Sequence, residues 1–235
     1  MSGPLPSEIG GLKSATYIDL QKHGSSTHAY RNYHNSFTGT LPTEVGLLRS
    51  TTYLRGHYNL FSGALPTEVG ALSAMKEFNF ASNDYSRQFP TEFGEMTSLY
   101  ATSWWGNEFS GKLPTQLGNL EKLTTGFKMQ YNDISKTVPT ELGRLTNSVQ
   151  MNFRDNEFTS TVPTQLGLLT GITKYLSFNG NRLIGTMPSE LGRLSLLTSL
   201  YQGYCSSRYW YSISEDQSIC ARNCEHDDDL FTSGG

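Results

Sequence analysis

The sequence predicts an α/β repeat solenoid, a fold in which similar coils of chain stack along one axis. Three observations support it: a recurring apolar-proline step, a recurring asparagine and an apolar pair of period two. Eight of the nine prolines follow an apolar residue at a spacing of 24 or 25 residues, after a first interval of 36. A period of this length is typical of repeat solenoids. The apolar positions are Leu5, Leu41, Leu65, Phe89, Leu113, Val138, Val162 and Met187.

The repeated unit reads LxxLxxLxLxxNxFxGxLPTELGx, and its LxL step predicts a short strand. Pairs such as Phe78 and Phe80 alternate with polar residues, so the apolar members face inward. A buried asparagine follows and can bond the backbone of its own coil and of its neighbour. Leaving it unpaired would cost about 1–3 kcal/mol, so its recurrence predicts a structural ladder. The ladder positions are Asn35, Asn59, Asn83, Asn107, Asn132, Asn156 and Asn181.

The second half of the unit predicts a turn, an extended segment and a return of the chain. Gly39, Gly63, Gly111 and Gly185 permit a tight or left-handed turn before each proline. The TELG segment then turns the chain back on the outer side. One repeat cannot bury its own apolar face, so the fixed positions form an interior that neighbouring coils share. The variable positions face water.

This frame resembles the plant-type leucine-rich repeat, whose LxGxLP step follows LxxLxLxxN, over roughly residues 3–205. The resemblance implies a curved right-handed superhelix with a concave parallel β-sheet and short 3-10 or helical turns on the convex side. It also implies binding roles, because such segments serve as receptor ectodomains, inhibitor-like binders and wall proteins.

The expected organisation is a solenoid of about eight repeats over residues 1–204 and a C-terminal cap with an acidic tail over residues 205–235. About twelve extra residues near positions 21–34 predict a loop, whose His23, His28 and His34 are better explained by a solvated loop than by a metal site. Two of Cys205, Cys220 and Cys224 can pair, with Cys205–Cys220 and Cys205–Cys224 as the alternatives. A zinc site is less favoured, because the cysteine spacing with His226 matches no common finger.

Several inward positions depart from the frame and predict a core that is locally loose or compensated. These positions are Thr51, Gly56, Thr102, Ser148 and Gln202. Loss of a core leucine typically costs about 2–5 kcal/mol, and Trp104 can fill part of the missing volume. Two units also carry one extra residue, near Gly126 and near Lys174, which predicts strand bulges of undetermined register.

The alternate positions of each strand predict a binding face on the concave side. Tyrosine, tryptophan and arginine are enriched there, as they are at interface hot spots, although strand propensity also favours such residues. The predicted face consists of Tyr53, Arg55, His57, Tyr58, Glu77, Asn79, Ser103, Trp105, Lys128, Gln130, Tyr131, Asn152, Arg154, Asp155, Tyr175, Ser177, Asn179, Tyr201 and Tyr204.

Composition and motifs restrict the function classes. A net charge of −3 and a pI near 6.0 do not provide the basic face that nucleic acid requires, and no apolar run is long enough to span a bilayer. MSGPLPSEIG has no secretory signal, so we expect a mature piece or a fragment. No catalytic or phosphate-binding motif is present, and we expect neither an enzyme nor a cofactor or metal.

The leading hypothesis is an extracellular or cell-surface recognition module for a protein, peptide or glycan. A structural subunit of a larger assembly, organellar or intracellular, is the alternative. It is favoured by the lack of both a paired-cysteine N-terminal cap and Asn-x-Ser/Thr sequons. Ice binding is a further alternative. It requires a flat array of similar short side chains, whereas the outward positions here vary in size and charge.

Overall fold

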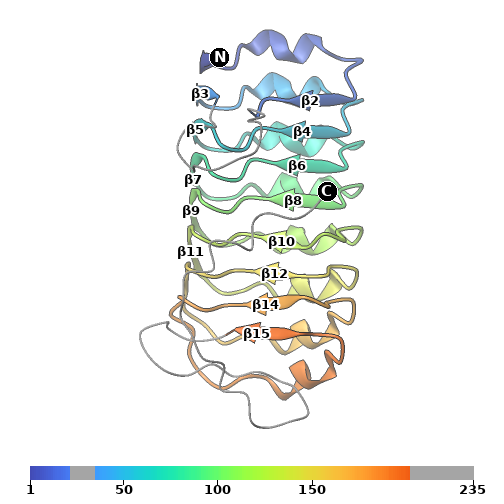
Figure 1. Ribbon diagram of the computed structural model, residues 1–235, viewed down its shortest axis with the longest axis vertical. Coiled ribbons are helices and arrows are strands. Elements are labelled where there is room, and N and C mark those ends of the chain that lie inside the picture. Colours follow the sequence, from blue (N-terminus) through green and yellow to red (C-terminus); the bar gives the residue numbers. More distant parts are fainter. Residues whose placement is uncertain (22–34, 202–235) are drawn as a thin grey trace, which may run out of the picture.

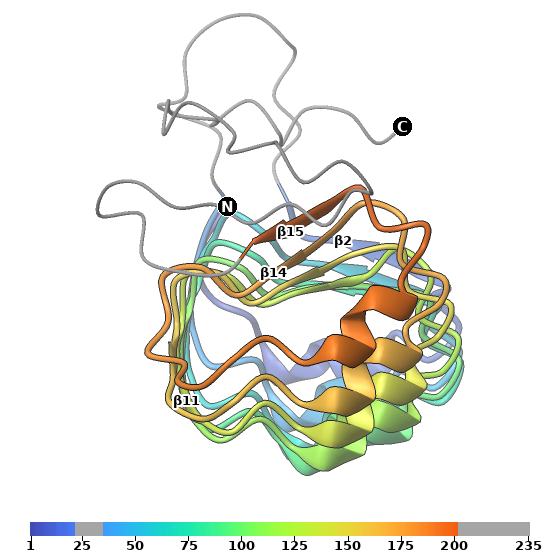
Figure 2. The same ribbon diagram turned by 90° about the horizontal axis from the view of Figure 1, so that it is seen from below.

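A computed structural model describes residues 1–21 and 35–201 of the 235-residue chain. In these residues the chain forms stacked coils with a parallel sheet on one side, a second parallel sheet beside it and short 3-10 helices opposite the first sheet (Figures 1 and 2). The predicted right-handed leucine-rich repeat superhelix is therefore confirmed. The insertion, Gln202, Tyr204 and the three cysteines lie outside the described residues.

Two sheets and a row of 3-10 helices repeat from coil to coil. The eight-stranded sheet has β2 (Tyr17–Asp19), β4 (Tyr53–Arg55), β6 (Glu77–Asn79), β8 (Ala101–Ser103), β10 (Phe127–Lys128), β12 (Met151–Asn152), β14 (Tyr175–Ser177) and β15 (Ser199–Tyr201) in that order. The seven-stranded sheet has β1 (Ser2–Pro4), β3 (Ser36–Gly39), β5 (Leu60–Gly63), β7 (Asp84–Arg87), β9 (Glu108–Gly111), β11 (Asp133–Lys136) and β13 (Glu157–Phe158). The helices are η1 (Ser7–Gly11), η2 (Thr43–Leu47), η3 (Thr67–Ala71), η4 (Thr91–Glu95), η5 (Thr115–Asn119), η6 (Thr140–Arg144), η7 (Thr164–Leu168) and η8 (Ser189–Arg193).

The pairing of β10 and β14 locates the two extra residues. Phe127 pairs with Thr102 and with Met151, so the coil before β10 contains one residue more than its neighbours. Gly126 accommodates it with a φ of +98°, and a Cβ there would lie 2.2 Å from the carbonyl oxygen of Gln150. The second extra residue similarly precedes Leu176, which pairs with Met151. Both therefore lie just before a strand of the eight-stranded sheet.

The irregular inward positions are compensated rather than loose. Thr51, Thr102 and Ser148 are buried, and their hydroxyls donate to carbonyl oxygens of the preceding coil at 2.7, 2.9 and 2.8 Å. The space beside Gly56 holds the ring of Phe80, which a Cβ at Gly56 would approach to 2.3 Å. Buried hydroxyls that keep a partner avoid the desolvation cost of an unpaired polar group.

The ladder asparagines link consecutive coils. Asn83 donates its side-chain amide to the carbonyl oxygens of Gly56 and Phe80, at 3.0 and 3.1 Å, and its carbonyl oxygen accepts the Phe61 amide at 3.1 Å. The same arrangement recurs through Asn107, Asn132, Asn156 and Asn181. Each buried amide therefore satisfies backbone groups that the turn would otherwise leave unpaired.

The 3-10 helices stack closely because each TELG segment has a glycine toward the next coil. A Cβ at these glycines would lie between 2.3 and 2.7 Å from the next coil's carbonyl oxygen. Only glycine allows that approach of backbone to backbone. The glycines are Gly46, Gly70, Gly94, Gly118, Gly143 and Gly167.

Candidate functional site

The candidate site is the solvent-facing side of the eight-stranded sheet, which we call the concave face. In β4, Leu54 is buried while Tyr53 and Arg55 are only partly covered, and the other strands follow the same alternation except β14, where Ser177 is also buried. Neighbouring strands of the sheet pair in register, so their outward positions form one row that crosses the sheet. It runs through Arg55, Asn79, Ser103, Lys128, Asn152, Ser177 and Tyr201.

The structure brings the described residues of the predicted face to this sheet and to the turns that follow its strands. Those within strands are Tyr53, Arg55, Glu77, Asn79, Ser103, Lys128, Asn152, Tyr175, Ser177 and Tyr201. Those that follow strands are His57, Tyr58, Trp105, Gln130, Tyr131, Arg154, Asp155 and Asn179. Tyr204 lies outside the described residues.

Three of the predicted residues are not accessible. Gln130, Ser177 and Asn179 expose only 1%, 3% and 4% of their surface. The Ser177 hydroxyl donates to Oδ1 of Asn179, so these two side chains satisfy one another instead of facing solvent. The alternation of side chains along a strand predicts the face of the sheet to which each one points. It does not predict whether a neighbouring residue covers that side chain.

The N-terminal end of the face carries a charge network. Arg55 donates to both carboxylate oxygens of Glu77, at 2.7 and 2.6 Å, and to the hydroxyl of Tyr17 at 3.0 Å. Tyr17 donates in turn to Asp19 at 3.1 Å. The hydrogen bonds to Glu77 raise the pKa of Arg55, and burial followed by the Asp19 hydrogen bond raises the pKa of Tyr17. The positive charge of Arg55 is thus paired within the protein.

Sequence reasoning missed Tyr17 and Asp19, although a signal was present. They pair in register with Tyr53 and Arg55 and occupy the same two outward positions of β2. The insertion that follows them interrupts the period and hides the correspondence. Tyr100 was also missed; it precedes β8, and a hydrogen bond with Tyr53 raises its pKa.

The C-terminal half of the face carries hydrogen-bonding groups and a positive charge that no described residue pairs. Lys128 is half-buried, and its pKa is lowered first by burial and then by the charge of Lys174. Burial raises the pKa of Tyr175, whose hydrogen bond with Asn152 acts in the opposite direction. This half therefore differs in charge from the self-neutralised end around Arg55.

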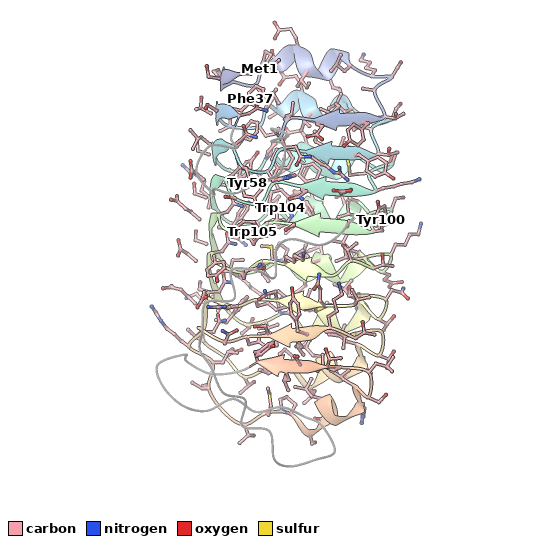
Figure 3. The ribbon with its side chains drawn as sticks, viewed as in Figure 1. Met1, Phe37, Tyr58, Tyr100, Trp104 and Trp105 are labelled. Atoms are coloured by element: carbon pink, nitrogen blue, oxygen red, sulfur yellow. The ribbon has the colours of Figure 1, made fainter. Side chains whose placement is uncertain are left out.

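Aromatic side chains line the edge of the sheet where the strands end. Figure 3 shows Tyr58 and Trp105 at this edge and Tyr100 at the opposite one; the Tyr58 and Trp105 rings meet edge to face at 5.9 Å. The Arg154 guanidinium lies 5.5 Å from the ring centre of Tyr131. Tyr58 and Tyr131 both have a φ of 59°, a conformation that is strained for a bulky residue. Partly exposed rings of this kind suit contact with a ligand.

A metal site and a membrane span each place requirements on the described residues. Within residues 1–21 and 35–201, no three His, Cys, Asp or Glu side chains are grouped so as to hold a metal ion. An open pocket of about 520 Å³ lies away from the concave face, lined in part by Lys112, Thr137, Pro139 and Thr161. In the same described ranges, no helix has the length and apolar character that a membrane crossing requires.

The chain is similar to known proteins in sequence over one repeat and in fold over most of its length. A family model described as Leucine Rich Repeat matches residues 173–194, and no curated protein matches the chain. The solved LRR ectodomain of the membrane receptor kinase GASSHO1/SCHENGEN3 from Arabidopsis thaliana, in complex with CASPARIAN STRIP INTEGRITY FACTOR 2, is 25% identical with a TM-score of 0.69. The alignment covers 86% of this chain and 26% of that one.

Two further solved structures are similar. The plant peptide hormone receptor RGFR1 in complex with RGF2 is 25% identical with a TM-score of 0.69, over 87% of this chain and 34% of that one. A plant ice-binding protein is 19% identical with a TM-score of 0.61, over 87% of this chain and 70% of that one. The last likeness concerns the fold alone. The chain spans about a quarter to a third of the two receptor chains.

Proposed function

We propose that this chain, a leucine-rich repeat protein of the plant type, is a non-enzymatic recognition module that binds a peptide along its concave face. The observation that carries the proposal is the row of paired strand positions from Arg55 to Tyr201, all of them partly exposed except Ser177. Tyr58, Trp105 and Tyr131 border this row. Rigid aromatic and arginine side chains provide large contact area at low entropy cost.

The size of the face suits an extended peptide. Eight strands spaced about 4.8 Å apart span roughly 34 Å, the length of about ten extended residues. One similar structure supports this class of ligand, since it is a plant peptide hormone receptor in complex with RGF2. On this proposal the module acts outside the cell, as the similar receptor ectodomains do.

The test selects peptides that bind the wild-type protein and then measures their affinity for a variant whose concave face is obstructed. A displayed library of random 12-residue peptides is selected on the wild-type protein, and the enriched peptides are synthesised. Their affinities are measured for the wild type, for a concave variant Asn79→Arg/Ala101→Arg and for a convex variant Asn119→Arg/Gln116→Arg. Both variants add two arginines, so net charge is matched.

We expect the selected peptides to lose at least tenfold in affinity for the concave variant and to bind the convex variant as the wild type. Bulky arginines at mid-sheet occupy the space that the peptide backbone would need. Equal binding to both variants, or a loss confined to the convex variant, would contradict the proposal. Melting temperatures of both variants show whether each is folded.

A regular column of hydroxyl side chains favours ice binding as a second candidate. In six of the seven strands of the seven-stranded sheet, from β3 to β13, one serine or threonine follows the buried residue, at Thr38, Ser62, Ser86, Ser110, Ser135 and Thr159. Exposed charged residues interrupt the array, including Asp84 and Arg87 beside Ser86. We therefore rank this function second. A thermal hysteresis measurement that detects no activity dismisses it, whereas clear activity would place it first.

A further inference from the structure

Polar side chains of the concave face satisfy one another toward both ends of the sheet. Arg55 pairs with Glu77, and Oδ1 of Asn79 accepts the Ala81 amide at 3.2 Å. At the other end, Oδ1 of Asn152 accepts the Arg154 amide at 3.1 Å. The Ser177 hydroxyl donates to Asn179. Each of these side chains therefore has a hydrogen-bond partner within the protein.

The centre of the face is different, because three neighbouring side chains have no partner among the residues that the structure describes. Oγ of Ser103 and both amide atoms of Gln130 are buried without a hydrogen-bond partner. The half-buried Lys128 ammonium has neither an ion pair nor a hydrogen bond with any described residue. Buried polar groups normally have partners, so the two exceptions, Ser103 and Gln130, beside an unpaired lysine require an explanation.

The three side chains belong to adjacent rungs. Ser103 of β8 pairs in register with Lys128 of β10, so their backbones are about 4.8 Å apart. Gln130 lies two residues after Lys128 and therefore on the same side of the chain. The Gly106 amide donates to the Gln130 carbonyl oxygen at 3.0 Å, which keeps the two coils together beyond the ends of the strands. The groups thus form one cluster.

The cluster is rich in donors and carries one central positive charge. An ammonium has three donors, a glutamine amide two and a hydroxyl one. An unpaired buried group of this kind costs about 1–3 kcal/mol. Burial and the nearby Lys174 lower the pKa of Lys128, so a negative ligand would relieve a charge that the protein leaves uncompensated.

We propose that Lys128, beside the buried side chains of Ser103 and Gln130, forms a subsite for the carboxylate of an aspartate or glutamate side chain in the bound peptide. This inference rests on the proposed function and names the residue type that the peptide must carry. One ammonium beside neutral donors complements the single negative charge of a carboxylate, and charge-assisted hydrogen bonds are the stronger kind.

The place of the cluster in the sheet argues for a side chain within the peptide. β10 is the fourth strand from one end of the eight-stranded sheet and the fifth from the other. A peptide of about ten extended residues along the face would have its ends near the ends of the sheet. An internal residue would therefore lie over Lys128.

The test uses the synthetic peptides from the selection described above, with both termini chemically blocked. Each peptide is made in its original form and with its aspartates and glutamates replaced singly by asparagine and glutamine. Affinities are measured by calorimetry for the wild type, Lys128→Gln and Lys112→Gln. The last variant removes the same charge from an exposed position away from the concave face.

We expect the selected peptides to contain an acidic residue whose replacement lowers affinity for the wild type at least tenfold. The same replacement should change the affinity for Lys128→Gln less than threefold, because the partner charge is already absent. Lys112→Gln should behave as the wild type. Lys128→Gln should also melt no lower than the wild type, because it removes a half-buried unpaired charge.

The outcomes separate this inference from the function on which it rests. If the peptides need the concave face but show no acidic preference, or lose equal affinity for Lys128→Gln in both peptide forms, the carboxylate subsite is refuted and peptide binding stands. If the peptides bind the concave variant Asn79→Arg/Ala101→Arg normally, peptide binding at this face fails and the subsite fails with it.

Discussion

At the scale of single residues, small polar side chains keep the stacked interior closed where the frame lacks leucine. The Trp104 indole nitrogen donates to Oγ1 of Thr102 at 2.8 Å, and Thr102 itself donates to the Phe78 carbonyl oxygen. The sequence predicts that Trp104 lies inward and fills volume. It does not predict this relay, because the hydrogen bonds depend on the distance between coils.

Tyr85 provides a stability prediction at this scale. Its ring stacks between those of Phe61 and Phe109, but its buried hydroxyl has no partner. We expect Tyr85→Phe to raise the free energy of unfolding by about 1 kcal/mol, because it removes an unsatisfied polar group and keeps the ring. Urea unfolding monitored by circular dichroism measures the change.

Phe109→Tyr is the matched control for Tyr85→Phe, because it adds a hydroxyl to the next ring of the same stack. We expect it to lower the free energy of unfolding by about 1–3 kcal/mol. A loss of stability in Tyr85→Phe would show that the hydroxyl has a partner and would refute this interpretation.

The candidate site could be predicted from the sequence only in part. Strand parity assigns Tyr53, Arg55 and Lys128 to the outward side because their neighbours in sequence are buried. Parity could not predict the burial of Gln130, since that depends on what covers it. It also could not predict that Arg55 is neutralised while Lys128 is not, because ion pairs between neighbouring strands depend on how those strands align.

At the scale of elements, the stacking of 3-10 helices depends on the glycine of each TELG segment. The sequence predicts that TELG turns the chain, and the structure adds the reason for its glycine: backbone atoms of the next coil occupy the place of a side chain. Neither the turn nor its composition indicates that contact, because the contact involves a residue of the following repeat.

Gly94→Ala and Gly192→Ala test this account as a matched pair, because both glycines end the same motif. A Cβ at Gly94 would lie 2.3 Å from the Gln116 carbonyl oxygen, whereas no atom of residues 1–21 and 35–201 lies within 4 Å of a Cβ at Gly192. We expect Gly94→Ala to cost at least about 2 kcal/mol of stability and Gly192→Ala less than about 0.5 kcal/mol. Thermal and urea unfolding compare the two; equal losses would exclude coil stacking as the cause.

At the scale of the whole molecule, the coils share one interior. A single cluster of buried apolar side chains extends from Leu5 to Leu200 through every described coil. The repeat period predicted this fold, because evenly spaced apolar, asparagine and proline positions allow few other architectures. The period placed the two extra residues near Gly126 and Lys174 but could not predict their register, since a bulge on either side of a strand preserves the spacing of the prolines.

The concave face is also a property of the whole molecule, because no single coil presents enough surface to bind a peptide. Neighbouring coils contribute one outward residue each to the row from Arg55 to Tyr201, and the unpaired cluster around Lys128 lies near its middle. Binding at this face and stability of the stack are therefore separable, and variants of outward residues should alter the first with little effect on the second.

Photo-crosslinking tests the central claim, peptide binding on the concave face, most directly. A selected peptide carrying benzoylphenylalanine near its middle is irradiated with the protein, and mass spectrometry locates the crosslinked residues. We predict crosslinks to β6, β8, β10 and β12 and to the turns that contain Trp105 and Tyr131. Crosslinks confined to the 3-10 helices or to the seven-stranded sheet would contradict the account and favour an assembly role for the outer side.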